Sequence, residues 1–334
     1  MKLSFTRIFT LLAGLSTGLA ANAQQDPHYS QFMHNKLVLN PGFAGNGDKF
    51  CFTGLQRTQW TGFGGGTEAG GVPRGAAPTN LVASFNAPVG NKFGVGLHLL
   101  RDELGFEVSI NPTLSLSYKQ QLKNGDVLAI GASAGLMQKS LDGTKLRPQE
   151  EGDPKIPTSA VSGSTMDFGA GVYYTKQSLL GMDDFYIGLS ASHLNQGSVT
   201  YEWNGGSTMV NTKMHYYLMT GAKYNLFSQI SLEPNILIKK DPAKIQADLN
   251  CYAVWNGSLY GGLTWRPMDA AVVLLGYRPQ ALQNLYVGYS YDLTTTRILN
   301  YSSGSHEIML RYCFGISIPK TYKPPVPVLT PRFM

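Results

Sequence analysis

The stretch from Gln229 to Lys239, QISLEPNILIK, decides the fold, because its side chains sort into two faces when they are taken alternately. One face is polar apart from Leu237, and the other is apolar: Ile230, Leu232, Pro234, Ile236 and Ile238. An alternation with period two is typical of a strand between an apolar and an aqueous environment. The stretch has eleven residues, which matches the roughly 9 to 11 residues that a tilted strand needs to cross a bilayer.

The same alternation recurs fourteen times from Asp48 onward, in segments separated by clusters of Gly, Asn, Pro and Asp. We therefore predict an all-β fold, a transmembrane antiparallel β-barrel over residues 50–318, because an even number of strands closes a single-chain barrel. The predicted strands cover residues 51–60, 79–88, 93–102, 105–121, 126–138, 165–176, 184–195, 212–225, 228–239, 245–255, 257–267, 270–279, 283–294 and 305–318.

The lengths of the connections give a second, independent indication of a barrel. Outer-membrane barrels have short periplasmic turns and longer external loops, whereas a soluble sandwich shows no such difference between its two ends. Here every second connection is short, and the four longest fall at the other end, at residues 61–78, 139–164, 196–211 and 295–304. We expect the short turns, and both chain termini, on the periplasmic side.

The ends and the composition indicate an exported protein. Lys2 and Arg7 precede an apolar stretch from Ile8 to Ala20 and a small-x-small site that ends at Ala23, so residues 1–23 are predicted to be a signal peptide. Gln24 follows instead of Cys, so no lipid anchor is expected. Without the signal peptide the formal net charge falls from +6 to +4, and the charges are too scattered for nucleic-acid binding.

Two segments fall outside the barrel pattern. Residues 24–49 are expected to form a periplasmic N-terminal segment with a short helix. Asp26 as N-cap and Pro27 at the first helical position mark the start of this helix, which continues from His28 to Val38. The apolar side of this helix predicts that it lies in or across the periplasmic mouth as a plug. Residues 319–334 contain five prolines, so we expect an extended periplasmic tail.

The sequence contains no recognisable catalytic or metal-binding motif. Its six histidines form no i, i+4 pair on a helix and no Cys-His cluster, and neither G-x-S-x-G nor H-E-x-x-H occurs. We therefore predict no catalytic residues, no metal ligands and no cofactors. A Ser-His or Asp-His site assembled from separate strands, as in an outer-membrane hydrolase, is the one enzymatic alternative that the sequence leaves open.

The three cysteines, Cys51, Cys251 and Cys313, lie far apart in the sequence. An odd count in an exported chain leaves at least one thiol unpaired. The first and last strands of a closed barrel are neighbours, which leaves a bridge between Cys51 and Cys313 open. Three small, unpaired residues among packed neighbours are the interpretation that the sequence favours.

Several motifs, taken together, resemble a known family. They are QDPHYSQFM at Gln25 to Met33, LNPGFAG at Leu39 to Gly45, RTQW at Arg57 to Trp60, DELG at Asp102 to Gly105, YSYDL at Tyr289 to Leu293, SHEI at Ser305 to Ile308 and PRF at Pro331 to Phe333. In this order they are similar to the PorP/SprF family, outer-membrane proteins of the type IX secretion system in Bacteroidota. The sequence departs from the family pattern at Lys36 and at Gly42-Phe43.

The resemblance implies a non-enzymatic role in exporting or surface-anchoring cargo that carries a type IX C-terminal signal, including gliding adhesins. It implies periplasmic ring proteins or peptidoglycan-associated lipoproteins as partners, besides the lipid of the outer membrane. A passive, porin-like channel is the alternative function. The candidate residues for contacts with partners or cargo are Phe32, Asn40, Pro41, Arg57, Gln59, Trp60, Asp102, Pro331, Arg332 and Phe333. On spacing alone, Arg57 and Asp102 favour a structural role.

Overall fold

The computed structural model describes residues 26–47, 49–63, 77–146, 150 and 152–315. The predicted signal peptide and the proline-rich tail lie outside the described residues, and so do Pro331, Arg332 and Phe333.

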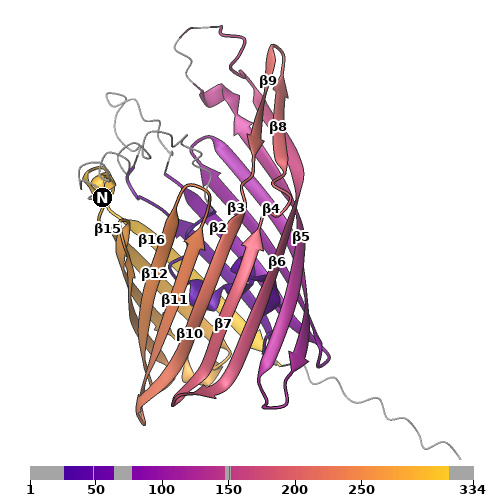
Figure 1. Ribbon diagram of the computed structural model, residues 1–334. Coiled ribbons are helices and arrows are strands. Elements are labelled where there is room, and N and C mark those ends of the chain that lie inside the picture. The colour runs from indigo at the N-terminus through magenta and orange to yellow at the C-terminus, as the bar shows by residue number, and fades with distance from the viewer. Residues whose placement is uncertain (1–25, 48, 64–76, 147–149, 151, 316–334) are drawn as a thin grey trace, which may run out of the picture.

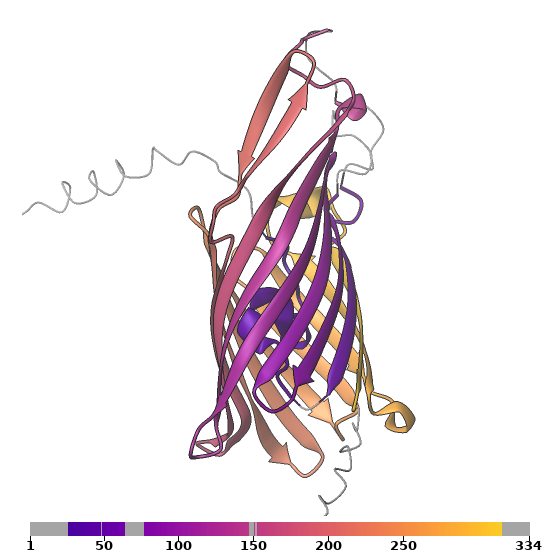
Figure 2. The same cartoon turned by 90° about the vertical axis from the view of Figure 1, so that its right-hand side faces the viewer.

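Fourteen antiparallel strands form a closed barrel (Figures 1 and 2). Each strand pairs with its sequence neighbours in the barrel, and β1 pairs with both β2 and β16, which closes the ring. The barrel strands are β1 (Phe50–Thr58), β2 (Thr79–Val89), β3 (Phe93–Leu104), β4 (Glu107–Gln121), β5 (Val127–Asp142), β6 (Ala160–Leu179), β7 (Met182–Ser192), β10 (His215–Phe227), β11 (Ile230–Lys240), β12 (Ile245–Trp255), β13 (Leu259–Arg266), β14 (Ala270–Tyr277), β15 (Leu285–Thr294) and β16 (Ser305–Phe314).

The prediction of a fourteen-stranded barrel is confirmed, and each predicted strand corresponds to one observed strand. The predicted connection at residues 196–211 instead contains two further strands, β8 (Ser198–Trp203) and β9 (Gly206–Asn211), which form a hairpin beyond the rim (Figure 1). The hairpin packs against an extension of β6, where Val199 and Tyr201 cluster with Val161. Asn204-Gly205 between the two strands is the local signal for this hairpin.

Side-chain polarity in the barrel is the reverse of that in a soluble protein. On β11, Ser231, Asn235 and Lys239 are buried in the interior, while Ile236 is exposed on the outside. This arrangement fits a barrel whose outer face contacts lipid and whose interior is polar. Leu237, the exception to the alternation, is only 1% exposed and belongs to the same buried cluster as Phe32. Position 237 points inward by the alternation of the strand, and an apolar side chain fits there because an apolar part of the chain lies inside the barrel.

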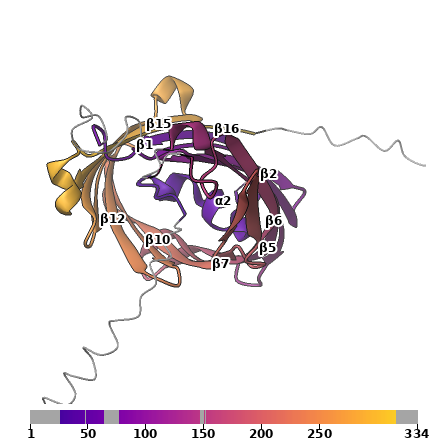
Figure 3. The same ribbon diagram turned by 90° about the horizontal axis from the view of Figure 1, so that it is seen from above.

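That part is residues 26–47, hereafter the N-terminal segment, which lies in the lumen (Figure 3). It begins beside His193 and His215, at the ends of β7 and β10 from which the long connections emerge. It reaches Gly45 beside Ala87 and Gly94, close to the short turn between β2 and β3. The segment therefore runs along the lumen, whereas the sequence predicted a plug at the periplasmic mouth.

The single helix predicted from His28 to Val38 is wrong. The segment contains a 3-10 turn at Phe32–His34, the one-turn helix α2 at Lys36–Leu39 and a 3-10 turn at Pro41–Phe43. Asp26 is not an N-cap, and the backbone N–H groups of Ser30 and Gln31 donate to the Glu307 carboxylate of the wall. A short helix is only marginally stable by itself, so contacts with the wall decide its conformation. Further 3-10 turns lie at Gly143–Lys145, Gln280–Leu282 and Arg297–Asn300.

Among the described residues, no helix is both long and apolar enough to span a membrane.

Glycines in the wall allow the N-terminal segment to approach the strands closely. A Cβ at Gly131 on β5 would lie 2.3 Å from the carbonyl oxygen of Pro41, and one at Gly94 on β3 would lie 2.1 Å from that of Ala44. Contacts this short do not occur between a real Cβ and backbone atoms. The turn at Pro41–Phe43 therefore rests directly on the backbone of the wall.

A disulfide bond joins Cys51 to Cys313, which corrects the expectation of three unpaired cysteines. The two residues are directly opposite each other on β1 and β16, with their Cα atoms 4.1 Å apart. The register of the closing strand pair, which the sequence does not specify, brings them together. Cys251 is a free, exposed thiol on β12.

Candidate functional site

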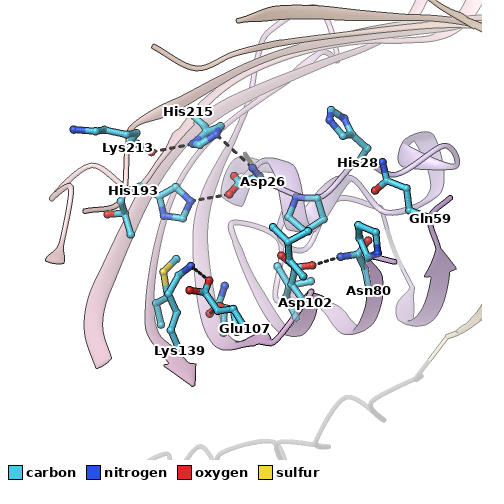
Figure 4. A pocket seen from close by; sticks show the side chains of 18 of the residues that line it. Asp26, His28, Gln59, Asn80, Asp102, Glu107, Lys139, His193, Lys213 and His215 are labelled. Atoms are coloured by element: carbon cyan, nitrogen blue, oxygen red, sulfur yellow. Dashed lines mark hydrogen bonds and ion pairs between the residues drawn. The ribbon is translucent and has the colours of Figure 1, made fainter. Parts of the chain in front are cut away.

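The N-terminal segment lies between two cavities in the lumen. The larger, which we call the long-loop cavity (Figure 4), has a volume of about 630 Å³. Its lining includes Trp60 and Lys213, which belong to long connections between strands. The smaller, the short-turn cavity, has a volume of about 320 Å³ and lies at the end with the short turns. Polar and charged side chains that line the long-loop cavity are Asp26, His28, Gln59, Asn80, Asp102, Glu107, Ser109, Asn111, Lys139, His193, Thr212, Lys213, His215, Lys244 and Asp269.

A buried charge network attaches the N-terminal segment to the wall. Arg57 on β1 is 1% exposed and places Nη2 2.8 Å from Asp292 Oδ2 and Nη1 3.4 Å from Glu307 Oε2. The same Glu307 carboxylate accepts the backbone N–H groups of Ser30 at 2.9 Å and Gln31 at 2.8 Å. Glu307 therefore replaces the hydrogen-bond partners that these N–H groups would have in a helix.

Arg266 on β13 extends the network around the wall. Its Nε lies 2.8 Å from Asp248 Oδ1 and its Nη1 lies 3.1 Å from Asp292 Oδ2. The Ser30 hydroxyl donates to Asp292 at 2.8 Å, so the segment contacts this carboxylate directly. Buried carboxylates are stable only when they are paired and hydrogen-bonded, and here the segment completes the pairing.

On the other side of the lumen, Asp26 forms a second attachment. His193 lies between two carboxylates, with Nε2 2.9 Å from Asp26 Oδ1 and Nδ1 2.8 Å from Asp167 Oδ1. Burial acts to lower the pKa of His193, but Asp26 and Asp167 outweigh it and raise that pKa to about 10. Burial likewise acts to raise the pKa of Asp26, but His193 and His215 hold it well below its usual value. Both groups are therefore charged at neutral pH.

The remaining contacts of Asp26 fix its orientation. Its Oδ2 accepts hydrogen bonds from the hydroxyl of Tyr217 and, at 3.3 Å, from that of Ser192. Its backbone N–H donates to His215 Nε2 at 3.4 Å, while His215 Nδ1 donates to the carbonyl oxygen of Lys213 at 2.9 Å.

Asn40 attaches the end of α2 to the wall. It is fully buried, and its Nδ2 donates to the carbonyl oxygens of Val172 at 3.1 Å and Leu189 at 3.3 Å. Its Oδ1 accepts the backbone N–H of Gly42 at 2.8 Å, which begins the turn at Pro41–Phe43. This side chain therefore joins β6 and β7 to the segment.

Lys36 lines the short-turn cavity. Its Nζ lies 3.4 Å from the centroid of the Tyr186 ring and 3.4 Å from the Tyr173 hydroxyl. Burial and the nearby Arg311 lower the pKa of Lys36 to about 7. Lys36, one of the departures from the family pattern, is thus a half-buried cation that no carboxylate contacts directly within the described residues.

The structure divides the predicted contact residues into two groups. Gln59, Trp60 and Asp102 line the long-loop cavity. The other four described candidates are buried between the N-terminal segment and the wall: Phe32, Asn40, Pro41 and Arg57.

Sequence reasoning missed the partners that attach the segment. Asp292 and Glu307 lie within the YSYDL and SHEI motifs, and both occupy inward positions of strands whose outward side chains, apart from His306, are apolar or aromatic. That position was a detectable signal for a buried charge. His193 and His215 gave no comparable signal, because their meeting depends on the pairing of β7 with β10.

Solved structures similar to this chain include the translocator domain of the autotransporter NalP from Neisseria meningitidis (11% identity, TM-score 0.40, 86% of this chain and 96% of that chain covered). They also include a FadL homologue from Pseudomonas aeruginosa (12% identity, TM-score 0.42, 87% of this chain and 95% of that chain covered). A third is the toluene transporter TodX from Pseudomonas putida (10% identity, TM-score 0.45, 83% of this chain and 91% of that chain covered). No curated protein matches the sequence.

The family model described as type IX secretion system membrane protein PorP/SprF matches residues 21–312. This range includes the N-terminal segment and nearly the whole barrel. The chain is therefore an outer-membrane β-barrel that belongs to the PorP/SprF family of type IX secretion system membrane proteins.

Proposed function

We propose that the protein is a non-enzymatic component of type IX secretion that helps to export or anchor cargo carrying a type IX C-terminal signal. The observation that supports this best is the long-loop cavity, about 630 Å³ in volume, beneath which the attached N-terminal segment forms a floor. A cavity with such a floor suits the holding of a protein segment better than free diffusion, which the rival function, a passive porin-like channel, requires.

In the proposed orientation the long-loop cavity faces the cell exterior. Outer-membrane barrels carry their longer loops outside and their short turns in the periplasm, and the β8–β9 hairpin adds to the long side here. In this orientation β16 ends on the periplasmic side, beside the start of β1. The N-terminal segment would then start near the outer side and lead inward to β1. In this orientation the expected periplasmic position holds for the end of β16 and not for Asp26.

Cargo contacts are proposed for the wall of this cavity. Gln59 and Trp60 follow β1, and Asp102, near the end of β3, accepts a hydrogen bond from Asn80 on β2. Phe32, Asn40, Pro41 and Arg57 would act indirectly, by holding the floor in place.

Site-specific photo-crosslinking in cells tests this proposal. A photoreactive amino acid at Gln59 should capture cargo that carries a type IX C-terminal domain. The same residue at Lys123, exposed on the short turn between β4 and β5, is the matched control and should capture none. Cargo captured equally at both positions, or captured at neither while the cargo still reaches the surface, would contradict the proposed site.

We also propose that the tail, residues 319–334, contacts a periplasmic ring protein or a peptidoglycan-associated lipoprotein. An extended proline-rich segment loses little entropy on binding, and Lys320, Lys323 and Arg332 favour an acidic surface. Pro331 to Phe333 would supply the contact. Truncation after Lys320 should leave membrane insertion intact and reduce co-purification of these partners. Full partner recovery and full cargo display by the truncated protein would show that the tail has no such role.

A further inference from the structure

Three side chains from separate parts of the chain converge at the wall of the long-loop cavity (Figure 4). They are Asp26 at the start of the N-terminal segment, His193 just after β7 and His215 at the start of β10. One potential ligand atom from each of the three lies within 4.8 Å of those of the other two. The two histidines are buried, which excludes a chance grouping of mobile surface side chains.

The second ring nitrogen of each histidine has a partner that orients the ring. His193 Nδ1 lies 2.8 Å from the Asp167 carboxylate, and His215 Nδ1 lies 2.9 Å from the carbonyl oxygen of Lys213. Both rings therefore direct Nε2 towards Asp26. Histidines that bind metals nearly always donate the other N–H to a carboxylate or a backbone carbonyl, and this site contains one example of each.

The carboxylate is oriented in the same way. Asp26 Oδ2 accepts hydrogen bonds from Tyr217 and Ser192, which leaves Oδ1 directed towards His193. Hydrogen bonds to the outer oxygen of a ligating carboxylate are a regular feature of metal sites. All three groups are thus held in place by contacts outside the cluster.

We propose that Asp26, His193 and His215 bind one divalent transition-metal ion of the zinc class. Two imidazole nitrogens and one carboxylate oxygen suit Zn²⁺, whereas Mg²⁺ and Ca²⁺ prefer oxygen ligands throughout. A fourth coordination position faces the long-loop cavity, where a water molecule or a ligand side chain completes the tetrahedron. This site attaches the start of the N-terminal segment to β7 and β10, and it does not depend on the proposed function.

Binding requires a small rearrangement. The ion takes the place of the proton between His193 Nε2 and Asp26 Oδ1, and that proton passes to solvent. These two atoms are 2.9 Å apart, whereas ligands about 2.0 Å from a tetrahedral ion lie about 3.3 Å from each other. A shift of this size lies within the reach of the two side chains. His215 Nε2 gives up the hydrogen bond that it accepts from the backbone N–H of Asp26 at 3.4 Å and binds the ion instead.

Metal titration of the full-length protein in detergent, purified without a histidine tag and stripped with a chelator, tests the proposal. Calorimetry and metal analysis should show one Zn²⁺ per chain, and Zn²⁺ should raise the Tm while Mg²⁺ should not. His215→Gln and Asp26→Asn should each weaken Zn²⁺ binding about tenfold or more, a loss of the size expected at metal sites. His306→Gln, on β16 and in contact with Tyr289, is the matched control and should bind Zn²⁺ as the wild type does.

A spectroscopic measurement on the wild type makes the test independent of how the variants fold. Co²⁺ should give the intense visible absorption of a tetrahedral site, and Zn²⁺ should abolish it by displacement. A folded wild-type protein that binds neither ion would overturn the proposal. Unchanged Zn²⁺ binding in folded His215→Gln and Asp26→Asn would overturn it as well.

Discussion

At the scale of single residues, Arg57 illustrates how strongly the interior depends on one cation. It is 1% exposed and faces Asp292 and Glu307. Replacing Arg57 by Met leaves both carboxylates short of a partner, and breaking a buried pair in this way costs about 3–5 kcal/mol. We expect a decrease of this order in the free energy of unfolding of Arg57→Met, measured by denaturant titration in micelles.

Arg101→Met provides the matched control. Arg101 also forms an ion pair, with Glu103, but its side chain is 46% exposed. Exposed pairs contribute about 0–1 kcal/mol. Equal losses in the two variants would show that burial of the Arg57 network has no energetic role.

Lys36 predicts a pH dependence of stability. Its pKa is about 7 in the folded protein and about 10.4 in an unfolded chain, so the unfolded state binds more protons between these values. Lys36 therefore destabilises the fold fully below pH 7, and this effect disappears as the pH rises towards 10. Lys36→Met should be more stable than the wild type at pH 7, with a difference that shrinks towards pH 10. Thermal unfolding at several pH values measures this difference, and a difference independent of pH would refute the lowered pKa of Lys36. Lys123→Met, at an exposed position, is the control and should show no such pH dependence.

At the scale of elements, the strands were predictable and the N-terminal segment was not. Alternation along β11 or β16 is a local property, because each side chain faces either lipid or the interior wherever the strand lies. The conformation of residues 26–47 depends instead on distant partners, such as Glu307 for the N–H groups of Ser30 and Gln31. Helix signals at Asp26 and Pro27 were therefore overridden by contacts that no local pattern reveals.

Close packing of the turn at Pro41–Phe43 on β5 makes a prediction for this element. A side chain at Gly131 would collide with the Pro41 carbonyl, so Gly131→Val should displace the turn, loosen the floor and raise conductance in planar bilayers. Overpacking of this kind costs about 1–3 kcal/mol. Gly261→Val on β13 is the control, because nothing lies within 4 Å of a Cβ there. An unchanged conductance of a folded Gly131→Val protein would show that the segment does not occlude the lumen.

At the scale of the whole molecule, the pairing of β1 with β16 decides whether the barrel has an edge. Nine residue pairs join the two strands, and Cys51–Cys313 adds a covalent link between them. Full closure removes the unpaired strand edges that lipid cannot tolerate. The hydrogen-bonded seam should therefore close the barrel without the disulfide, and the disulfide should act mainly on the unfolded chain.

The disulfide spans 262 residues, so it removes much of the conformational freedom of the unfolded protein. The chain-entropy model gives an upper value of roughly 5.5 kcal/mol for such a loop, and native disulfides typically contribute about 2–4 kcal/mol. The Cys51→Ser/Cys313→Ser double variant should still insert and run as a compact species on unboiled gels, yet unfold at lower denaturant concentration. Cys251→Ser, which removes the free thiol, should match the wild type.

Gel migration tests whether the bridge forms. Boiled wild-type protein should migrate faster without reductant than with it, because the bridge joins the two ends of the barrel chain. Identical migration with and without reductant would show that the bridge does not form.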